Sequence, residues 1–225
     1  MNYQIMGETV PAVEFTLSRG ESLYTQSGSM SWKTPNIKME TNTRGGIAKG
    51  LGRMLAGESL FMNTFTAEAE NEQIAFSARV PGCVLPVDLT GSPGVIIQKG
   101  AFLCAQPSID CQITLTKRFS AGLFGGEGFI LEKLSGNGLA FLEVDGDKKE
   151  LELAPGQVIQ VDTGNVVAFE STVAYEIETV KGLGNILFGG EGLFLTRLTG
   201  PGKVILQTLN FNDFAGRIAS LIPGR

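Results

Sequence analysis

The sequence predicts an all-β fold in which three similar units form one compact domain, shaped as a β-sandwich or a barrel-like structure and followed by a short C-terminal helix. Three observations predict it: short β-forming apolar runs recur along the chain, turn dipeptides separate them, and one sequence pattern occurs three times. The chain has 225 residues, 43% hydrophobic and 18% charged. A chain of this size buries enough apolar surface to fold without disulfides or metal ions.

Turn signals divide the chain into short strands. Pro-Gly pairs occur at residues 81–82, 93–94, 155–156, 201–202 and 223–224. Asn137-Gly138 and Asp145-Gly146 are typical of hairpin turns. The segment 148–153 alternates charged residues with leucine, as a half-buried strand does. Other expected strands cover Gln73–Val80, Ile109–Thr116, Val158–Val161, Thr172–Val180 and Lys203–Leu209.

Two segments carry helical signals. A short helical turn is expected at Gly50–Ala56. The stronger signal is Asn212–Leu221, with Asn212 as candidate N-cap and with Phe214, Ile218 and Leu221 on one face. The sequence therefore predicts a single short helix at the C-terminal end of a β domain.

An internal repeat is the strongest signal. Three apolar segments each follow a Gly-Glu pair, at Gly57-Glu58, Gly126-Glu127 and Gly190-Glu191, so that the glutamates are 69 and 64 residues apart. A second pattern precedes each of these segments and centres on a glycine, at Gly28, Gly100 and Gly164, which are 72 and 64 residues apart. Matching order and spacing indicate a triplicated β unit of about 65 residues.

We expect one domain over residues 1–225, with units near 1–74, 75–138 and 139–202 and a tail at 203–225. The run after each Gly-Glu pair has three consecutive apolar residues, which predicts cover on both faces of that strand. Packing of the three units around a pseudo-threefold axis would supply this cover.

The repeated motif resembles a known family. The stretch Arg44–Phe65, which contains Ala-Gly-Glu-Ser-Leu-Phe at 56–61, and the later Phe-Gly-Gly-Glu-Gly repeats are similar to the altered-inheritance-of-mitochondria family. The resemblance covers nearly the whole chain. It implies a triplicated β fold classed with the tryptophan RNA-binding attenuation protein, oligomeric assembly and no established catalytic activity. The family has a mitochondrial branch linked to inner-membrane organisation, but the sequence looks like a prokaryotic member. Neither that role nor RNA binding is carried over.

The repeated glutamates are candidate binding residues. If Glu58, Glu127 and Glu191 converge on the pseudo-axis, their mutual repulsion would favour a bound cation or a raised pKa. The alternative is structural, because each carboxylate could accept backbone N–H bonds or pair with a cation where a strand begins.

A basic, glycine-rich loop at residues 43–57 is the second candidate. Glycine N–H groups together with Arg44, Lys49 and Arg53 could hold a phosphate or an acidic head group. A solvated loop or a subunit contact is the structural alternative. The later loop pairs Leu123-Phe124 and Leu187-Phe188 fit either a core or subunit contact, or a membrane contact.

Composition excludes several function classes. The chain has no histidine, which removes Ser-His-Asp and Cys-His nucleophiles, histidine metal sites and histidine pH switches. A net charge of −5 argues against a nucleic-acid binder that neutralises many phosphates. Cys83, Cys104 and Cys111 fit no metal-ligand spacing and are expected to be reduced thiols. We expect no catalytic residues, no metal and no cofactor.

These observations together predict a non-catalytic oligomeric β scaffold or binding protein, whose partners are a second copy of itself, another protein or a membrane surface. The alternative is a peripheral membrane or anionic-ligand binder that uses the loop 43–57. The sequence has no signal-peptide pattern and no apolar stretch of membrane-spanning length, so we expect a soluble cytoplasmic protein.

Overall fold

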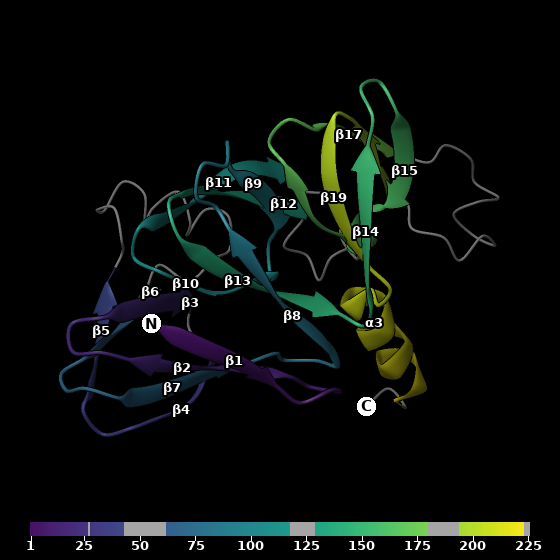
Figure 1. Ribbon diagram of the computed structural model, residues 1–225. Helices are drawn as coiled ribbons and strands as arrows, with labels where there is room; N and C mark the ends of the chain where they lie inside the picture. The colour runs from purple at the N-terminus through teal and green to yellow at the C-terminus, as the bar shows by residue number, and fades with distance from the viewer. Residues whose placement is uncertain (27, 43–61, 118–128, 180–193, 223–225) are drawn as a thin grey trace.

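The computed structural model describes the chain except for residue 27 and residues 43–61, 118–128, 180–193 and 223–225. Within the described residues, four β-sheets, one 3₁₀ turn, η2 (Thr163–Asn165), and the helix α3 (Phe211–Leu221) make up the regular structure (Figure 1). The predicted all-β class with a short C-terminal helix is confirmed.

All strand pairings within the described residues are antiparallel. The first sheet contains, in spatial order, β1 (Asn2–Met6), β2 (Ala12–Leu17), β7 (Glu72–Ser77) and β4 (Met30–Lys33). The second contains β5 (Ile37–Asn42), β6 (Met62–Ala67), β3 (Ser22–Gln26), β10 (Phe102–Ala105), β13 (Leu139–Asp145) and β8 (Gly82–Asp88). The third contains β11 (Ile109–Lys117), β12 (Phe129–Gly136), β9 (Val95–Gln98), β16 (Val166–Glu170), β19 (Gly202–Gln207) and β14 (Lys148–Leu153). The fourth contains β15 (Val158–Asp162), β18 (Phe194–Thr199) and β17 (Ala174–Thr179).

Three hydrophobic cores lie between these sheets. One core joins residues of β2 and β7 to residues of β3, β5 and β6, and its centre is a group of phenylalanines. The Phe141 ring lies 4.9 Å from the rings of both Phe15 and Tyr3, with interplanar angles of 90° and 79°. Edge-to-face contacts of this kind add to the free energy gained by burying the rings.

Strand β12 contributes to two of the three cores. Its residues Phe129 and Leu131 pack in the core beside β16 and β18, whereas Leu134 packs in the core beside β10 and β13. Phe129, Ile130 and Leu131 are all at most 1% exposed. The predicted cover on both faces is thus confirmed for this run, while the other two Gly-Glu runs lie partly outside the described residues.

The prediction of hairpins at the two Xaa-Gly turns is wrong. Gly138 and Gly146 do have positive φ, at 138° and 71°, and the chain turns there. However, the strand before Gly138 is in the third sheet and the strand after it is in the second, and the chain crosses back at Gly146. The strands flanking each turn pair with other partners, so these turns connect opposite sheets of a sandwich.

The helix begins one residue earlier than predicted, and its N-cap is Asn210 instead of Asn212. Asn210 has an extended backbone, with φ −92° and ψ 104°, and its side chain accepts a hydrogen bond from the Asp213 N–H at 3.4 Å. Phe211 is already helical. The chain offers two asparagines close together, and the one nearer the end of β19 has the extended backbone that an N-cap requires.

Truncation of Phe141 tests the first core. We expect Phe141→Ala to lower the free energy of unfolding by about 3–5 kcal/mol, because it leaves a cavity beside two aromatic partners. Denaturant unfolding followed by circular dichroism measures this change. The control Val158→Ala, at a position 38% exposed, should change stability by less than about 0.5 kcal/mol. Similar small effects for both variants would contradict the described core.

Candidate functional site

The residues that the sequence singled out for binding lie outside the described residues. They are Arg44, Lys49, Arg53, Glu58, Glu127 and Glu191. The same holds for the short helix expected at 50–56 and for the loop pairs at 123–124 and 187–188. Whether the glutamates converge therefore stays a prediction, and the candidate site is built from the part of the chain that the structure describes.

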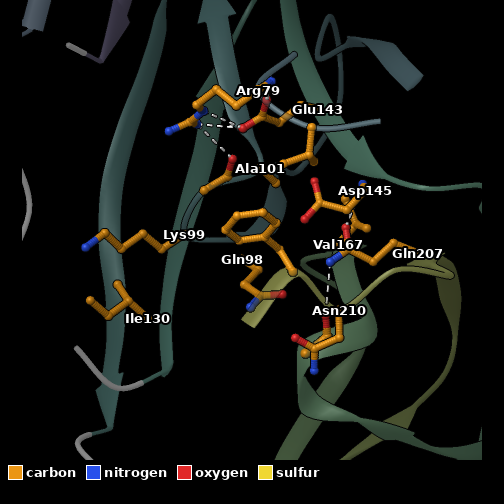
Figure 2. A pocket seen from close by; sticks show the side chains of 14 residues that line it. Arg79, Gln98, Lys99, Ala101, Ile130, Glu143, Asp145, Val167, Gln207 and Asn210 are labelled. Carbon is orange, nitrogen blue, oxygen red and sulfur yellow. Dashed lines mark hydrogen bonds and ion pairs between the residues drawn. The ribbon is translucent and has the colours of Figure 1, made fainter. Parts of the chain in front are cut away.

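A pocket of about 470 Å³ lies where several strand ends meet the start of α3 (Figure 2). Arg79 and Val80, which follow β7, form one wall, and the turn at residues 98–101 between β9 and β10 forms another. The remaining lining comes from strands β12, β13, β16 and β19, from η2 and from the first turn of α3. The pocket is within the size range of small-ligand sites.

Arg79 and Glu143 form a fixed ion pair at this pocket. The Arg79 Nη2 and Nε atoms lie 2.6 and 2.9 Å from Glu143 Oε1, and the Arg79 backbone N–H donates to Glu143 Oε2 at 3.0 Å. Nη2 also donates to the Gly100 carbonyl at 3.2 Å. The Glu143 side chain is only 7% exposed, so these bonds satisfy both oxygens of a buried carboxylate and tie the β9–β10 turn to β13.

Asp145 lies two residues further along β13, on the same side of the strand as Glu143. Figure 2 shows its carboxylate directed into the pocket. Burial, together with the negative charge of Glu143, raises the pKa of Asp145 to about 6, and the positive charge of Arg79 opposes the shift. No described side chain hydrogen-bonds this carboxylate, although its backbone N–H donates to Gln207 Oε1 at 3.0 Å.

Gln207 and Asn210 hold the opposite wall. Gln207 Nε2 donates to the Gly164 carbonyl at 3.0 Å, and Asn165 Nδ2 donates to the Gln207 carbonyl at 2.8 Å. A Cβ at position 164 would overlap the side-chain amide of Asn210, so a larger residue there would displace the side chain that caps α3. Gly100 and Gly164, two of the three glycines in the second repeated pattern, thus both line the pocket.

The described residues contain no group of three or more Cys, Asp or Glu side chains that could hold a metal ion. None of the three cysteines forms a disulfide. Cys104 is fully buried, which raises the pKa of its thiol well above the usual value, and burial also raises the pKa of Cys83. In the part of the chain that the structure covers, no helix has the length and apolar character needed to cross a bilayer.

Comparison with known proteins identifies the class. The family model described as "Mitochondrial biogenesis AIM24" matches residues 3–209, and the chain belongs to this family. An uncharacterized protein of Streptococcus pyogenes serotype M6 is 29% identical over 221 residues, which cover 95% of this chain and 87% of that protein. The crystal structure of a Streptococcus pyogenes protein superimposes with a TM-score of 0.79 at 26% identity, and covers 98% of this chain and 99% of its own. The resemblance to the family is thereby confirmed.

Sequence reasoning missed the residues that line this pocket. Arg79 and Gln207 carry no motif, and their roles depend on strands that pair across long sequence distances. One signal was present: Glu143 and Asp145 are two residues apart on an expected strand, and period-two spacing places both acids on one face. Two carboxylates on one face of a strand repel each other. In the structure Arg79 neutralises the charge of Glu143, and no described side chain pairs with Asp145.

Asp145 should lower the stability of the native protein at neutral pH. Its folded-state pKa is raised, so the ionised form is penalised, and this penalty is present above pH 6 and absent below about pH 4. We expect Asp145→Asn to raise the free energy of unfolding by about 1 kcal/mol at pH 7.5, after allowing for solvent screening. The gain should vanish at pH 4. Urea unfolding of both proteins at the two pH values measures it, and a loss of stability at pH 7.5 would contradict the description.

Proposed function

We propose that this protein is a non-catalytic β scaffold or binding protein that assembles with a second copy of itself. The observation that supports this proposal most is the exposed apolar face of α3. Five large apolar residues of this segment are exposed by 43–83%: Phe211, Phe214, Ile218, Leu221 and Ile222. Their spacing places them along one face of the helix, as in a helix that packs against a partner.

The helix makes little contact with the rest of the chain. Among the residues of α3 whose side chains are described, Ala215 alone is half-buried and the others are exposed. An isolated helix of 11 residues that contains a glycine is marginal in water. Contact with another molecule would bury the apolar face and stabilise the helix.

Charge favours a protein partner over a lipid surface. Between Phe211 and Ile222, the helix carries one acid, Asp213, and one base, Arg217, so its net charge is zero. Helices that lie on anionic membranes have a polar face rich in lysine and arginine. The α3 segment lacks this excess of positive charge and offers no electrostatic attraction to such a membrane.

Self-complementarity favours a second copy as the partner. In an antiparallel pair of α3 helices, the apolar faces of the two copies can pack against each other, with Phe214 and Ile218 of each copy near the centre of the contact. A contact in which both copies use the same surface closes as a dimer with twofold symmetry.

We further propose that the scaffold consists of three copies of one six-strand unit. The sets β2-β7-β4, β8-β13-β10 and β14-β19-β16 have the same strand order, as do β3-β6-β5, β9-β12-β11 and β15-β18-β17. Register shifts between Met30 and Trp32, Phe102 and Cys104, and Val166 and Ala168 supply independent support. These register shifts begin at residues 30, 102 and 166, so they are 72 and 64 residues apart, like the three glycines of the second repeated pattern at 28, 100 and 164. On this basis the units run near residues 12–77, 82–145 and 148–207.

Two further expectations remain proposals. A cytoplasmic location is supported by three cysteines that form no disulfide, since secreted domains tend to join theirs in disulfides. A fold related to the tryptophan RNA-binding attenuation protein is supported by the threefold recurrence of strand order and by the family resemblance.

Charge substitution on α3 tests the assembly. We expect the wild-type chain to dimerise, and Phe214→Asp/Ile218→Asp to be monomeric, because two carboxylates would be buried in the apolar interface. Sedimentation velocity over a wide range of protein concentration measures this difference. The matched control Val10→Asp/Met39→Asp changes two residues with similar exposure outside α3, at 49% and 51%, and should remain dimeric.

Three outcomes would contradict the proposal. The wild-type protein could be monomeric at every concentration, or the α3 variant could remain dimeric. Alternatively, a monomeric wild type could bind lipid vesicles in an α3-dependent manner, which would assign the apolar face to a membrane.

A further inference from the structure

The pocket beside β13 contains a half-buried carboxylate, Asp145, that no described side chain bonds. Among the described residues, Glu143 is fully bonded to Arg79, but the Asp145 carboxylate has no hydrogen-bond or ion-pair partner. Carboxylates removed from water are normally paired or hydrogen-bonded, because losing hydration costs several kcal/mol. None of the residues that the structure describes supplies this partner, although Arg79 is close enough to influence Asp145 electrostatically.

The ion pair with Glu143 explains why Arg79 cannot fill this role. Its Nε and Nη2 atoms and its backbone N–H all donate to Glu143, and Nη2 also holds the Gly100 carbonyl. Rotation of the guanidinium towards Asp145 would break these bonds and leave a buried carboxylate unpaired. A ligand that pairs with the Asp145 carboxylate in this pocket would therefore carry a positive charge.

Lys99 also lines the pocket, but Figure 2 shows its ammonium group directed away from Asp145, and the other lining residues favour an organic cation over a metal ion. Ala101, Ile130, Val167 and Phe211 provide apolar surface, and an aromatic ring attracts a nearby cation. The Gln98 and Asn210 side chains, which also line the pocket, provide amides for polar substituents. A bare metal ion would leave most of a volume of about 470 Å³ unfilled and would find few carboxylate ligands.

We propose that this pocket binds a small organic molecule bearing a primary ammonium group, with Asp145 as the charge partner of that group. The ammonium lies against the Asp145 carboxylate, and its carbon skeleton lies against the apolar wall formed by β12, β16 and the first residue of α3. The Arg79–Glu143 pair positions the β9–β10 turn and does not contact the ammonium. The site shares Phe211 with the exposed apolar face of α3, whereas its charge partner Asp145 lies on β13, outside that face.

Calorimetric titration with named probes tests the site. The probes are ethanolamine, putrescine and phenethylamine, and the matched compounds are 2-phenylethanol, which is neutral, and 3-phenylpropionate, which is anionic. At pH 7.5 we expect saturable binding of at least one amine to the wild-type protein, and weaker binding of the two matched compounds. Asp145→Asn should reduce the amine affinity by about tenfold or more, because the ion pair is lost.

Asp147→Asn is the matched control, since it removes a carboxylate from the same turn outside the pocket lining and should leave the affinity unchanged. Asp145→Asn is expected to be at least as stable as the wild type, so a loss of binding cannot be attributed to unfolding. The proposal is overturned if no amine binds, if the alcohol or the carboxylate binds as well as phenethylamine, or if Asp145→Asn binds amines like the wild type.

Discussion

The structure depends on sheets that continue from one hydrophobic core into the next. Strand β10 pairs with β13 on one side and with β3 on the other, and β9 pairs in the same way with β12 and β16. Each six-stranded sheet therefore serves two cores. Side chains from β6 and β12 enter one core from one face and a neighbouring core from the other. Separating β3 from β10, or β9 from β16, would expose apolar side chains of the two cores that the sheet joins. The cores are therefore expected to fold together.

The pocket is a consequence of this arrangement. The pairing of β10 with β13 shifts register next to Leu142, and the pairing of β16 with β19 shifts register next to Leu206. Glu143 and Gln207 are the residues that directly follow these two leucines. One is a carboxylate that binds Arg79, and the other is an amide that binds the Gly164 carbonyl. The Gln207 amide also accepts a hydrogen bond from the Asp145 N–H, which links the ends of β13 and β19 beside the start of α3. Asp145, the last residue of β13, has a raised pKa, and an energetically unfavourable carboxylate in a cavity is typical of a functional site.

The sequence predicted local features well and long-range pairing poorly. Strands such as Ile109–Lys117 and Lys148–Leu153 were predicted almost to the residue, because alternation and turn residues act locally. The turns at Gly138 and Gly146 were located correctly but assigned to hairpins, since a positive φ specifies a reversal and not the partner of the next strand. The N-cap was misplaced by two residues, from Asn210 to Asn212, because both asparagines fit the pattern.

Prediction of the candidate site was limited for the same reason. Arg79 and Glu143 are 64 residues apart in the chain, and no local pattern indicates that they meet. The predicted basic loop and repeated glutamates lie outside the described residues, so they remain separate predictions. Glycine spacing came closest to finding the pocket, because Gly100 and Gly164 mark the turns that line it.

Native mass spectrometry of the gently purified wild-type protein tests the central claim, self-association of a scaffold, most directly. It reports the number of chains in the assembly and the mass of any retained small molecule in one spectrum. The account predicts a dimer that separates into single chains when α3 carries Phe214→Asp and Ile218→Asp. A wild-type spectrum that contains only single chains, under conditions that preserve known dimers, would contradict it.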